Sequence, residues 1–355
     1  MTEALEAAAP AVPHRKIIRS WLLPICRRNT ALALGLAVLD CAALALLLTG
    51  VVRAPHIAAQ LLCGTAAGFV IGRLFILAHD ACHQSLTDHR RLNRFLGRLL
   101  ILPSLTPYSL WDKGHNVVHH GYTNLRDFDF VWQPLTLAEY RALSPQRQCL
   151  QRIYRSGWVP WLYYGVEIWW KRLFFPSRAL MPTRRPIFWI DSLVVAVLAA
   201  AWIAALALIA SATGRSPVRL VLCGFVLPQL AWNAMIGFIV YVHHTHPRIA
   251  WFSDKASWAR SQPFVSSTVH VRFRRFMGLD WGAAIHHINE HTAHHVDMTI
   301  PLYRLRGAQA LLEQRISSIV VQEFSWRWYF DTARRCKLYD YERDRWTDFD
   351  GRPSS

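Results

Sequence analysis

Histidine is concentrated in a few short segments of this sequence. Seventeen histidines are present, and thirteen of them lie in four clusters: His79 and His83; His115, His119 and His120; His243, His244 and His246; and His286, His287, His291, His294 and His295. Neutral imidazole is a frequent ligand of transition metals, and rings spaced i, i+4 project from one face of a helix. The pattern predicts a metal centre whose ligands come from several segments.

Three of these segments have spacings that suit metal ligands. HxxxH spans 79–83, HxxxHH spans 115–120 and HxxHH spans 291–295, and together they contribute eight histidines. A structural zinc takes four protein ligands and a hydrolytic zinc about three, so eight predict a binuclear centre or several sites. Imidazole alone admits zinc, copper, nickel or iron. A pair of metal ions with mainly nitrogen ligands, placed beside membrane spans, favours iron as the metal and oxygen activation as the chemistry.

Polar residues close to these segments are expected to support the ligands. A carboxylate that accepts the second ring N–H of a ligand fixes its tautomer and orientation. We assign this supporting role to Asp80, Asn116 and Glu290, with further carboxylates available at Asp112, Asp127 and Asp129.

The elements that must position the histidines are predicted to be membrane helices. The chain has 355 residues, 53% hydrophobic, and 16 Trp, which is too apolar for an ordinary soluble domain. Four apolar segments are long enough to cross a bilayer, at about 31–52, 57–78, 187–211 and 218–242. Short linkers join them into two hairpins. We therefore expect an all-α integral membrane protein with four spans and a helical cap. A six-span alternative would add residues 95–111 and 158–175, which we interpret as interfacial.

The basic residues predict the orientation. Most Lys and Arg lie before the first span, between 79 and 186, and after His243, so these parts should face the cytoplasm together with both termini. We divide the chain into an arm at 1–30, a catalytic domain at 31–305 and a tail at 306–355. The net charge of +17 suits an anionic leaflet better than nucleic acid. The seven cysteines form no CxxC pair, as expected of reduced thiols.

With these histidine segments, the sequence resembles the membrane fatty acid desaturase family. The order HDACH, HNVVHH and HTAHH carries the resemblance, and flanking residues extend it over about 64–305. These flanks are 114–116, 119–124, 242–247, and 290–295 continuing to 300–303. They are similar to the branch that contains bacterial and plant acyl-lipid Δ12 (omega-6) enzymes. This resemblance implies a multi-pass protein located in the bacterial inner membrane.

The resemblance implies a diiron centre that uses O2 and two electrons to introduce a cis double bond into an acyl chain. The family's ligands correspond to His79, His83, His115, His119, His120, His291, His294 and His295. A ninth ligand is expected at His244, with His246 and His286 as alternatives. His286 matches the His of a His-Asn pair in the family. His287 stands in place of the Asn, so this chain departs from the family pattern at this pair.

Substrate and electrons must reach this centre from different sides. An acyl chain should enter an apolar tunnel from the bilayer, with Trp111, Tyr122, Trp132 and Trp281 as candidate lining or as an interfacial aromatic belt. The chain has no Rossmann glycine pattern and no cluster-binding Cys run, so a separate carrier such as a ferredoxin, cytochrome b5-like or rubredoxin-like protein is implied. Its expected docking surface, or else a lipid-headgroup contact, is Arg272, Arg274, Arg275, Arg334 and Arg335.

Three rival functions use the same residues. An acyl hydroxylase, epoxygenase or acetylenase would share the ligands and differ in product, and a carotenoid oxygenase has similar boxes. A histidine-rich metal transporter would place its ligands within the spans near the middle of the membrane, whereas these clusters lie at the ends of the spans and outside them.

Overall fold

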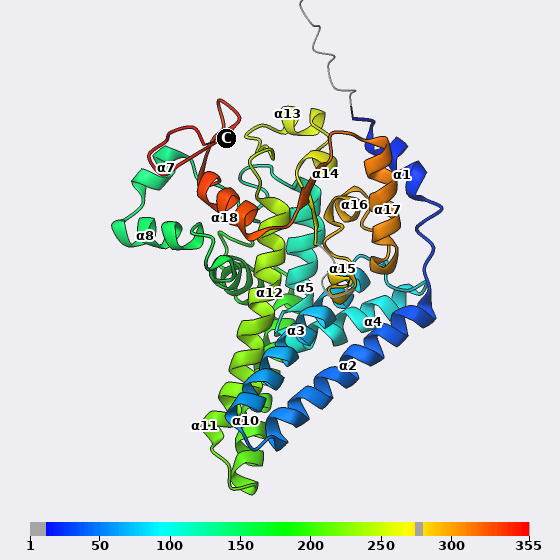
Figure 1. Cartoon of the computed structure of the whole chain (residues 1–355), viewed down its shortest axis with the longest axis vertical. Coiled ribbons are helices and arrows are strands. Elements are labelled where there is room, and N and C mark those ends of the chain that lie inside the picture. The colour runs from blue at the N-terminus through cyan, green and yellow to red at the C-terminus, as the bar shows by residue number, and fades with distance from the viewer. Residues whose placement is uncertain (1–11, 274–279, 355) are drawn as a thin grey trace, which may run out of the picture.

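Four long helices and a helical cap make up this protein. The computed structural model describes residues 12–273 and 280–354. Within these ranges, four helices are long and apolar enough to cross a membrane. They are α2 (Thr30–Arg53), α3 (Ile57–Cys82), α10 (Pro186–Ala212), and a continuous helix from Pro217 to His244 formed by α11 (Pro217–Val221), η4 (Leu222–Val226) and α12 (Leu227–His244). All four extend from the cap in the same direction (Figure 1), which confirms the predicted architecture.

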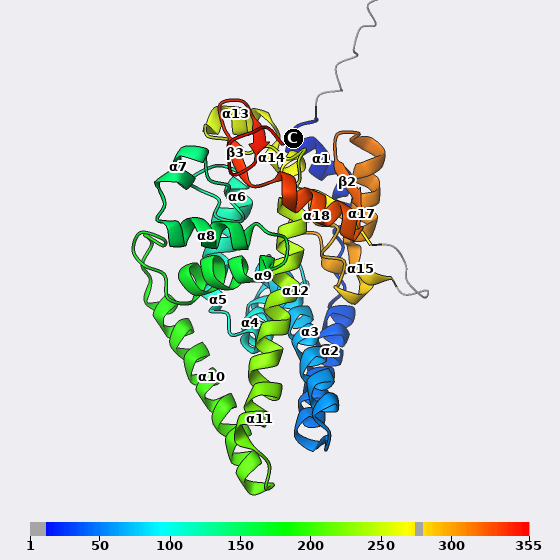
Figure 2. The ribbon, with the colours of Figure 1, turned by 60° about the vertical axis from the view of Figure 1, so that its left-hand side comes forward.

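The spans form two hairpins whose tips lie away from the cap. Residues 54–56 join α2 to α3, and residues 213–216 join α10 to α11. Both tips lie at the end of the molecule opposite the cap (Figure 2), and they contact each other, because Arg215 donates to the Arg53 and Ala54 carbonyls. Because every histidine segment lies at or beyond the opposite ends of the spans, the structure brings the clusters to one side, as the span count predicts.

The two proposed interfacial segments form short helices. Residues 95–111 fall into α4 (Arg90–Ile101), η1 (Leu102–Ser104) and α5 (Tyr108–Asp112), while 158–175 hold α9 (Pro160–Tyr163) and η3 (Tyr164–Phe174). Proline lacks a backbone N–H and favours helix starts, and Pro103 and Pro107 mark the starts of η1 and α5. Neither segment is among the helices long enough to span in the described residues, so the four-span count holds.

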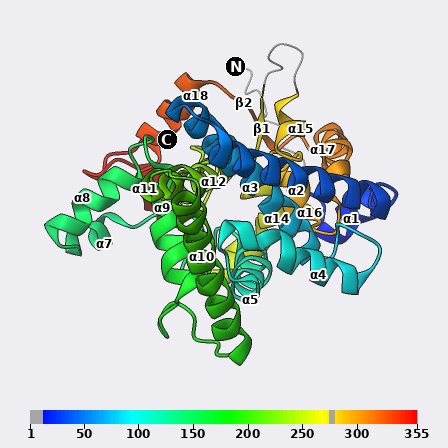
Figure 3. The ribbon, with the colours of Figure 1, turned by 90° about the horizontal axis from the view of Figure 1, so that it is seen from below.

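Helices α3 and α12 are the inner pair of spans, and each carries histidines at its cap end. The apolar windows of α2 and α10 are only 17% buried, against 61% for α3 and 44% for the Pro217–His244 helix. The outer helices α2 and α10 run in different directions when seen from below (Figure 3). Glycine permits close backbone approach between membrane helices: a Cβ on Gly64 would lie 2.2 Å from the Cys223 carbonyl oxygen, and one on Gly68 would lie 2.6 Å from that of Pro228.

Two carboxylates within the spans are held in ion pairs. Asp40 of α2 pairs with Arg73 of α3 at 2.9 Å and also contacts His286 Nε2 at 2.7 Å. Asp191 of α10 pairs with Arg98 at 2.9 Å. Charged groups in a bilayer are costly unless they are paired, and these pairs join each carboxylate's helix to a neighbouring segment.

The cap is helical with four short strands. Its helices are α6 (His120–Tyr122), α7 (Leu137–Ala142), α8 (Pro145–Tyr154), α13 (Lys255–Arg260), α14 (Pro263–Ser266), α15 (Trp281–Ala284), α16 (His291–Val296), α17 (Leu302–Arg315) and α18 (Trp326–Arg335). Strand β1 (Val269–Arg272) pairs parallel with β2 (Val320–Glu323), and β3 (Leu338–Asp340) pairs antiparallel with β4 (Arg345–Thr347). Strands of three or four residues are too short to show a periodic pattern in sequence.

Both ends of the described chain fold onto the cap. Helix α1 (Arg15–Leu22) lies against the third histidine segment, where Arg15 Nε donates to the Val296 carbonyl and Arg19 pairs with Asp297 at 2.9 Å. Helix α17 runs across residue 305, the expected boundary of the tail, and β2 beyond it pairs with β1. The segment predicted as a tail is therefore packed against the histidine-bearing part of the chain.

Candidate metal centre

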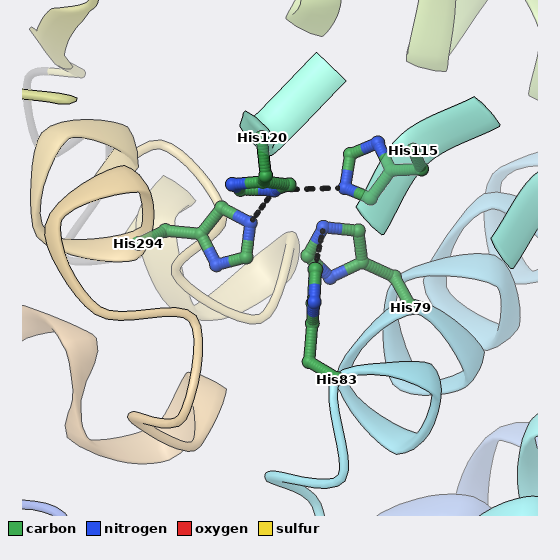
Figure 4. A group of neighbouring side chains, drawn as sticks. All are labelled: His79, His83, His115, His120 and His294. Carbon is green, nitrogen blue, oxygen red and sulfur yellow. Dashed lines mark hydrogen bonds between the residues drawn. The ribbon is translucent and has the colours of Figure 1, made fainter. Parts of the chain in front are cut away.

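Nine histidines converge in two groups within the cap. The ligand atoms of each group lie within 4.8 Å of one another. The first group is His79, His83, His115, His120 and His294, and the second is His119, His244, His291 and His295. Figure 4 shows the first group, whose rings come from three separate segments and point toward a common centre. The eight histidines of the three sequence segments are all present, together with His244.

A wide helical turn explains how the second segment serves both groups. Residues 113–119 form η2 (Lys113–His119), a π-helix in which the His120 backbone N–H bonds to the His115 carbonyl. This i, i+5 spacing brings His115 and His120 together, with 3.1 Å between their Nε2 atoms. His119 consequently points to the other group. A regular α-helix would instead align His115 with His119, so the π-turn is the local feature that separates the ligands.

The third segment is divided by ordinary helical geometry. Helix α16 places His291 and His295 four residues apart, with 3.1 Å between their Nε2 atoms. His294 lies on a different face and approaches His120 at 3.0 Å. His244, the last residue of α12, completes the second group at 2.8 Å from His291. One short helix therefore contributes to both groups.

The nitrogen separations fit rings arranged around metal ions. Facing Nε2 atoms lie between 2.8 and 3.3 Å apart. Two nitrogens bound to one ion at about 2.1 Å would lie roughly 3.0–3.4 Å apart for angles between a right angle and tetrahedral. Neither group contains a carboxylate or a thiolate among the described residues. This all-imidazole donor set suits transition-metal ions rather than magnesium or calcium.

Burial favours the neutral, metal-binding form of six of the nine rings. Except for half-buried His115, they are buried. Burial is the main reason that the pKa of each of six rings lies well below the usual histidine value, and the neighbouring rings also lower this pKa. This holds for His83, His115, His120, His291, His294 and His295. These imidazoles are neutral near pH 7, and a neutral ring nitrogen is the ligand form.

Two buried aspartates hold ligand rings from behind. Asp129 contacts His119 Nδ1 at 3.0 Å and also accepts the backbone N–H groups of Asn124 and Val131. Asp80 contacts His79 Nδ1 at 3.3 Å and accepts the Leu302 N–H at 2.6 Å. A carboxylate at Nδ1 places the ring proton there and leaves Nε2 free to bind metal.

The other supporting residues have different partners. Asn116 donates to Asp112 at 2.7 Å and lies beside Cys82, so it holds η2 against α3 without touching a ligand ring. Glu290 contacts His270 Nε2 at 2.7 Å. Asp127 is exposed.

The two alternatives to His244 lie outside both groups. The His246 ring accepts the Arg248 backbone N–H through Nδ1 at 3.0 Å, and burial, followed by Arg248, lowers its pKa to about 4. His286 contacts Asp40 of α2. Geometry therefore favours His244 as the ninth ligand.

Asp129→Asn is expected to weaken metal binding by about 10–100-fold, the usual cost of losing a partner behind a histidine ligand. The amide has a single oxygen, so it can still accept one of the two backbone N–H groups, but it loses the carboxylate at His119. The measurement is metal retained per chain during titration with a chelator. The matched control is Asp127→Asn, because Asp127 is exposed and both positions lie in one loop. Equal metal retention in the two variants would contradict the role of Asp129.

An apolar cavity lies against both histidine groups. Its volume is about 70 Å³. Its walls include His79 and His115 of the first group and His119, His244 and His291 of the second. The remaining lining is apolar or aromatic: Phe75, Ile76, Trp111, Phe130, Val131, Tyr164, Ile168, Leu173, Ile236, Ile239, Val240 and Ile288. The cavity places an apolar lining directly beside the histidine rings.

Only one of the aromatic residues proposed for a tunnel lines this cavity. Trp111 stacks on His115 with 4.4 Å between ring centroids. Tyr122 stacks on Phe128 instead, and Trp281 is 40% exposed. Trp132 is buried behind the wall and stacks on Tyr163. The aliphatic lining comes mainly from segments whose apolar residues looked like ordinary core in the sequence.

Comparisons with known proteins agree with this site. A family model described as fatty acid desaturase matches residues 55–325. The chain is 27% identical over 283 residues to a chloroplastic omega-6 fatty acid desaturase of Glycine max, covering 78% of this chain and 62% of that protein. It is 26% identical over 276 residues to an sn-1 oleoyl-lipid 12-desaturase of Synechocystis sp., covering 78% and 74%. An sn-1 oleoyl-lipid 12-desaturase of Arthrospira platensis is 30% identical over 240 residues, covering 67% and 64%.

Proposed function

This chain belongs to the fatty acid desaturase family, and we propose that it introduces a cis double bond into a fatty acyl chain at a dimetal centre. The observation that carries this proposal is the apolar cavity whose walls include histidines of both groups. A cavity of this kind gives the methylene groups of an acyl chain access to the metal ligands while its apolar walls exclude water.

We propose that the two histidine groups hold two iron ions. The ligands would be His79, His83, His115, His120 and His294 for one ion, and His119, His244, His291 and His295 for the other. When bound, the iron pair supplies the O2-dependent removal of two hydrogens from adjacent methylene groups, with two electrons from outside. No side chain has that oxidising power. The other residues bind, orient and shield.

Those other residues act on the substrate and on the ligand rings. Ile168, Ile239 and Val240 are cavity walls that hold the acyl chain extended, and a fixed chain presents the same carbons in each turnover. Asp129 keeps a proton on His119 Nδ1. The neutral state of the buried rings preserves their affinity for metal near pH 7.

The substrate and the bond position are proposed from the relatives. Their names specify omega-6 or oleoyl-lipid 12-desaturation, and we extend the Δ12 position on an acyl lipid to this chain. The aligned part covers 62% of the Glycine max protein and 64% of the Arthrospira platensis protein, so both assignments belong to the proposal.

We further propose that the cap and both termini are cytoplasmic, that the membrane is the bacterial inner membrane, and that a separate carrier delivers the electrons. Basic residues flank the cap ends of the spans, as the positive-inside rule requires. At the candidate docking surface, Arg272 pairs with Glu313 and Arg334 pairs with Asp331. Arg335 donates to the Ser354 carbonyl, and Arg274 and Arg275 lie outside the described residues. These pairs leave the guanidinium groups of Arg272 and Arg334 about half exposed or more.

Expression in a bacterial host that makes oleate but no dienoic acid tests the function. We expect labelled oleate to become a labelled diene that has lost two hydrogens, detected by gas chromatography with mass spectrometry. The host without this chain is the control. A labelled product that keeps both hydrogens and gains oxygen, or the absence of any new product, would overturn the assignment as a desaturase.

A further inference from the structure

A second buried polar cluster lies behind one wall of the cavity. At its centre is Arg155, which follows α8 and is only 2% exposed. Its Nη2 donates to the Gln133 carbonyl at 2.8 Å. Its Nε and Nη1 groups have no acceptor among the described residues, and no carboxylate forms an ion pair with it in that part of the chain. A guanidinium stays charged in a protein interior, so this is a buried cation with unused donors.

The surroundings of Arg155 supply more donors rather than an acceptor. The indole Nε1 of Trp132 and the hydroxyl of Tyr241 are also buried without a partner among the described residues. Their rings lie 4.6 Å apart, and the Arg155 guanidinium lies 5.9 Å from the Trp132 ring. Cation–π attraction at this distance compensates for part of the lost hydration, but it leaves the Nε and Nη1 groups of Arg155 and the Trp132 indole N–H without an acceptor.

A second cation reinforces the positive charge. Lys337 Nζ donates to the Arg155 backbone carbonyl. Burial, followed by the nearby Arg155 cation, lowers the pKa of Lys337 to about 8. Positively charged groups are rarely buried without a compensating negative group. The buried positive charge lacks a counter-ion, and the buried N–H and O–H groups lack acceptors. A negatively charged hydrogen-bond acceptor would satisfy both.

We propose that Arg155, Trp132 and Tyr241 bind a small inorganic monoanion of the size and charge of chloride, with Lys337 adding to the positive field. Three different side chains would donate N–H or O–H groups to it. A lipid phosphate or an acyl carboxylate is a poor candidate, because Arg155, Trp132 and Tyr241 are each 2% exposed or less and a headgroup must remain attached to the bilayer.

The position of the cluster gives this anion a role in the shape of the cavity. In three segments, a cavity-lining residue is adjacent in sequence to a residue of the cluster or one packed against it: Val131 with Trp132, Tyr164 with Tyr163, and Val240 with Tyr241. An anion that holds Trp132 and Tyr241 together would stiffen this wall from behind. Trp132 adopts a backbone φ of +57°, which is unfavourable for a bulky residue and needs such support.

Equilibrium dialysis of the iron-loaded protein in detergent against radioactive chloride tests the proposal, with gluconate maintaining the ionic strength. We expect saturable binding of one chloride per chain. The thermal unfolding midpoint should rise by about 3 °C on replacing gluconate with saturating chloride, since a ligand that binds only the folded state stabilises it. Arg155→Gln should lose both the binding and the shift.

Arg152→Gln is the matched control, because Arg152 lies in the same helix and donates to the Tyr140 hydroxyl. It should retain binding and the shift. Trp132→Phe removes one N–H donor and should weaken chloride binding several-fold, so it provides a reading if Arg155→Gln does not fold. Absence of saturable chloride in the parent protein overturns the proposal. So does parental affinity in Arg155→Gln or, if that variant does not fold, in Trp132→Phe.

Discussion

His294→Ala and His295→Ala are each expected to abolish diene formation, with a fall in product of at least about 100-fold. Loss of a residue that merely supports a metal ligand already costs about 10–100-fold, and these two rings lie inside the groups themselves. The two residues are adjacent in α16 but belong to different groups. Both ions should therefore prove necessary. The measurement is product by gas chromatography together with iron per chain.

The two variants should differ in iron content. His294→Ala leaves four imidazoles in its group, whereas His295→Ala leaves three. We expect His295→Ala to lose more iron, because fewer donors remain. His246→Ala is the matched control, since His246 is buried in the same cap but lies in neither group. It should retain iron and activity within about 2-fold, as expected when no metal contact is removed. Equal loss in all three variants would contradict the division into groups.

The sequence predicted the ligands better than it predicted how they are arranged. Spacing identified eight rings that the structure gathers in two groups, because repeated histidines at helical intervals are rare in a sequence. The division of His115 and His120 from His119 depends on the π-turn of η2. No residue pattern that we used distinguishes a π-turn from an α-turn, since the two differ by one hydrogen-bond register.

The supporting residues were harder to predict because they depend on tertiary contacts. Asp80 is adjacent to the ring that it holds, so the sequence was sufficient there. Asp129 reaches His119 through a loop whose fold is fixed by its own backbone hydrogen bonds. Glu290, next to a ligand in sequence, points to His270 instead. Adjacency along the chain is a weak guide once a helix begins at the next residue.

The spans were predictable and the cavity was not. Long apolar segments identify spans through length and composition alone, and the four segments agree with α2, α3, α10 and the Pro217–His244 helix. The cavity walls come from several distant elements, and eight of their seventeen residues are aliphatic. From the sequence alone, such aliphatic residues cannot be distinguished from residues that pack in the core. Aromatic residues drew attention as candidate lining, yet Tyr122 and Trp281 lie elsewhere.

Val240→Trp is expected to abolish diene formation while iron binding is retained. Val240 is a half-buried residue of α12 that lines the cavity, four residues before His244. An indole at this position fills space that the acyl chain needs beside the second histidine group. The substitution removes no metal ligand, so iron per chain should remain within about 20% of the parent value, the fall in product being a loss of substrate access. Product and iron are measured on the same membrane preparation.

Val197→Trp is the matched control, because Val197 of α10 is 59% exposed on the outside of the spans and should face lipid, where an indole is tolerated. It should retain both iron and activity. Val240→Ala should also remain active, since it enlarges the cavity. If Val240→Trp lost its iron, the smaller Val240→Phe would test the same point with less disturbance of packing. Parental activity in an iron-loaded Val240→Trp or Val240→Phe would show that the acyl chain does not pass this wall, and the cavity would then lose its role as the substrate site.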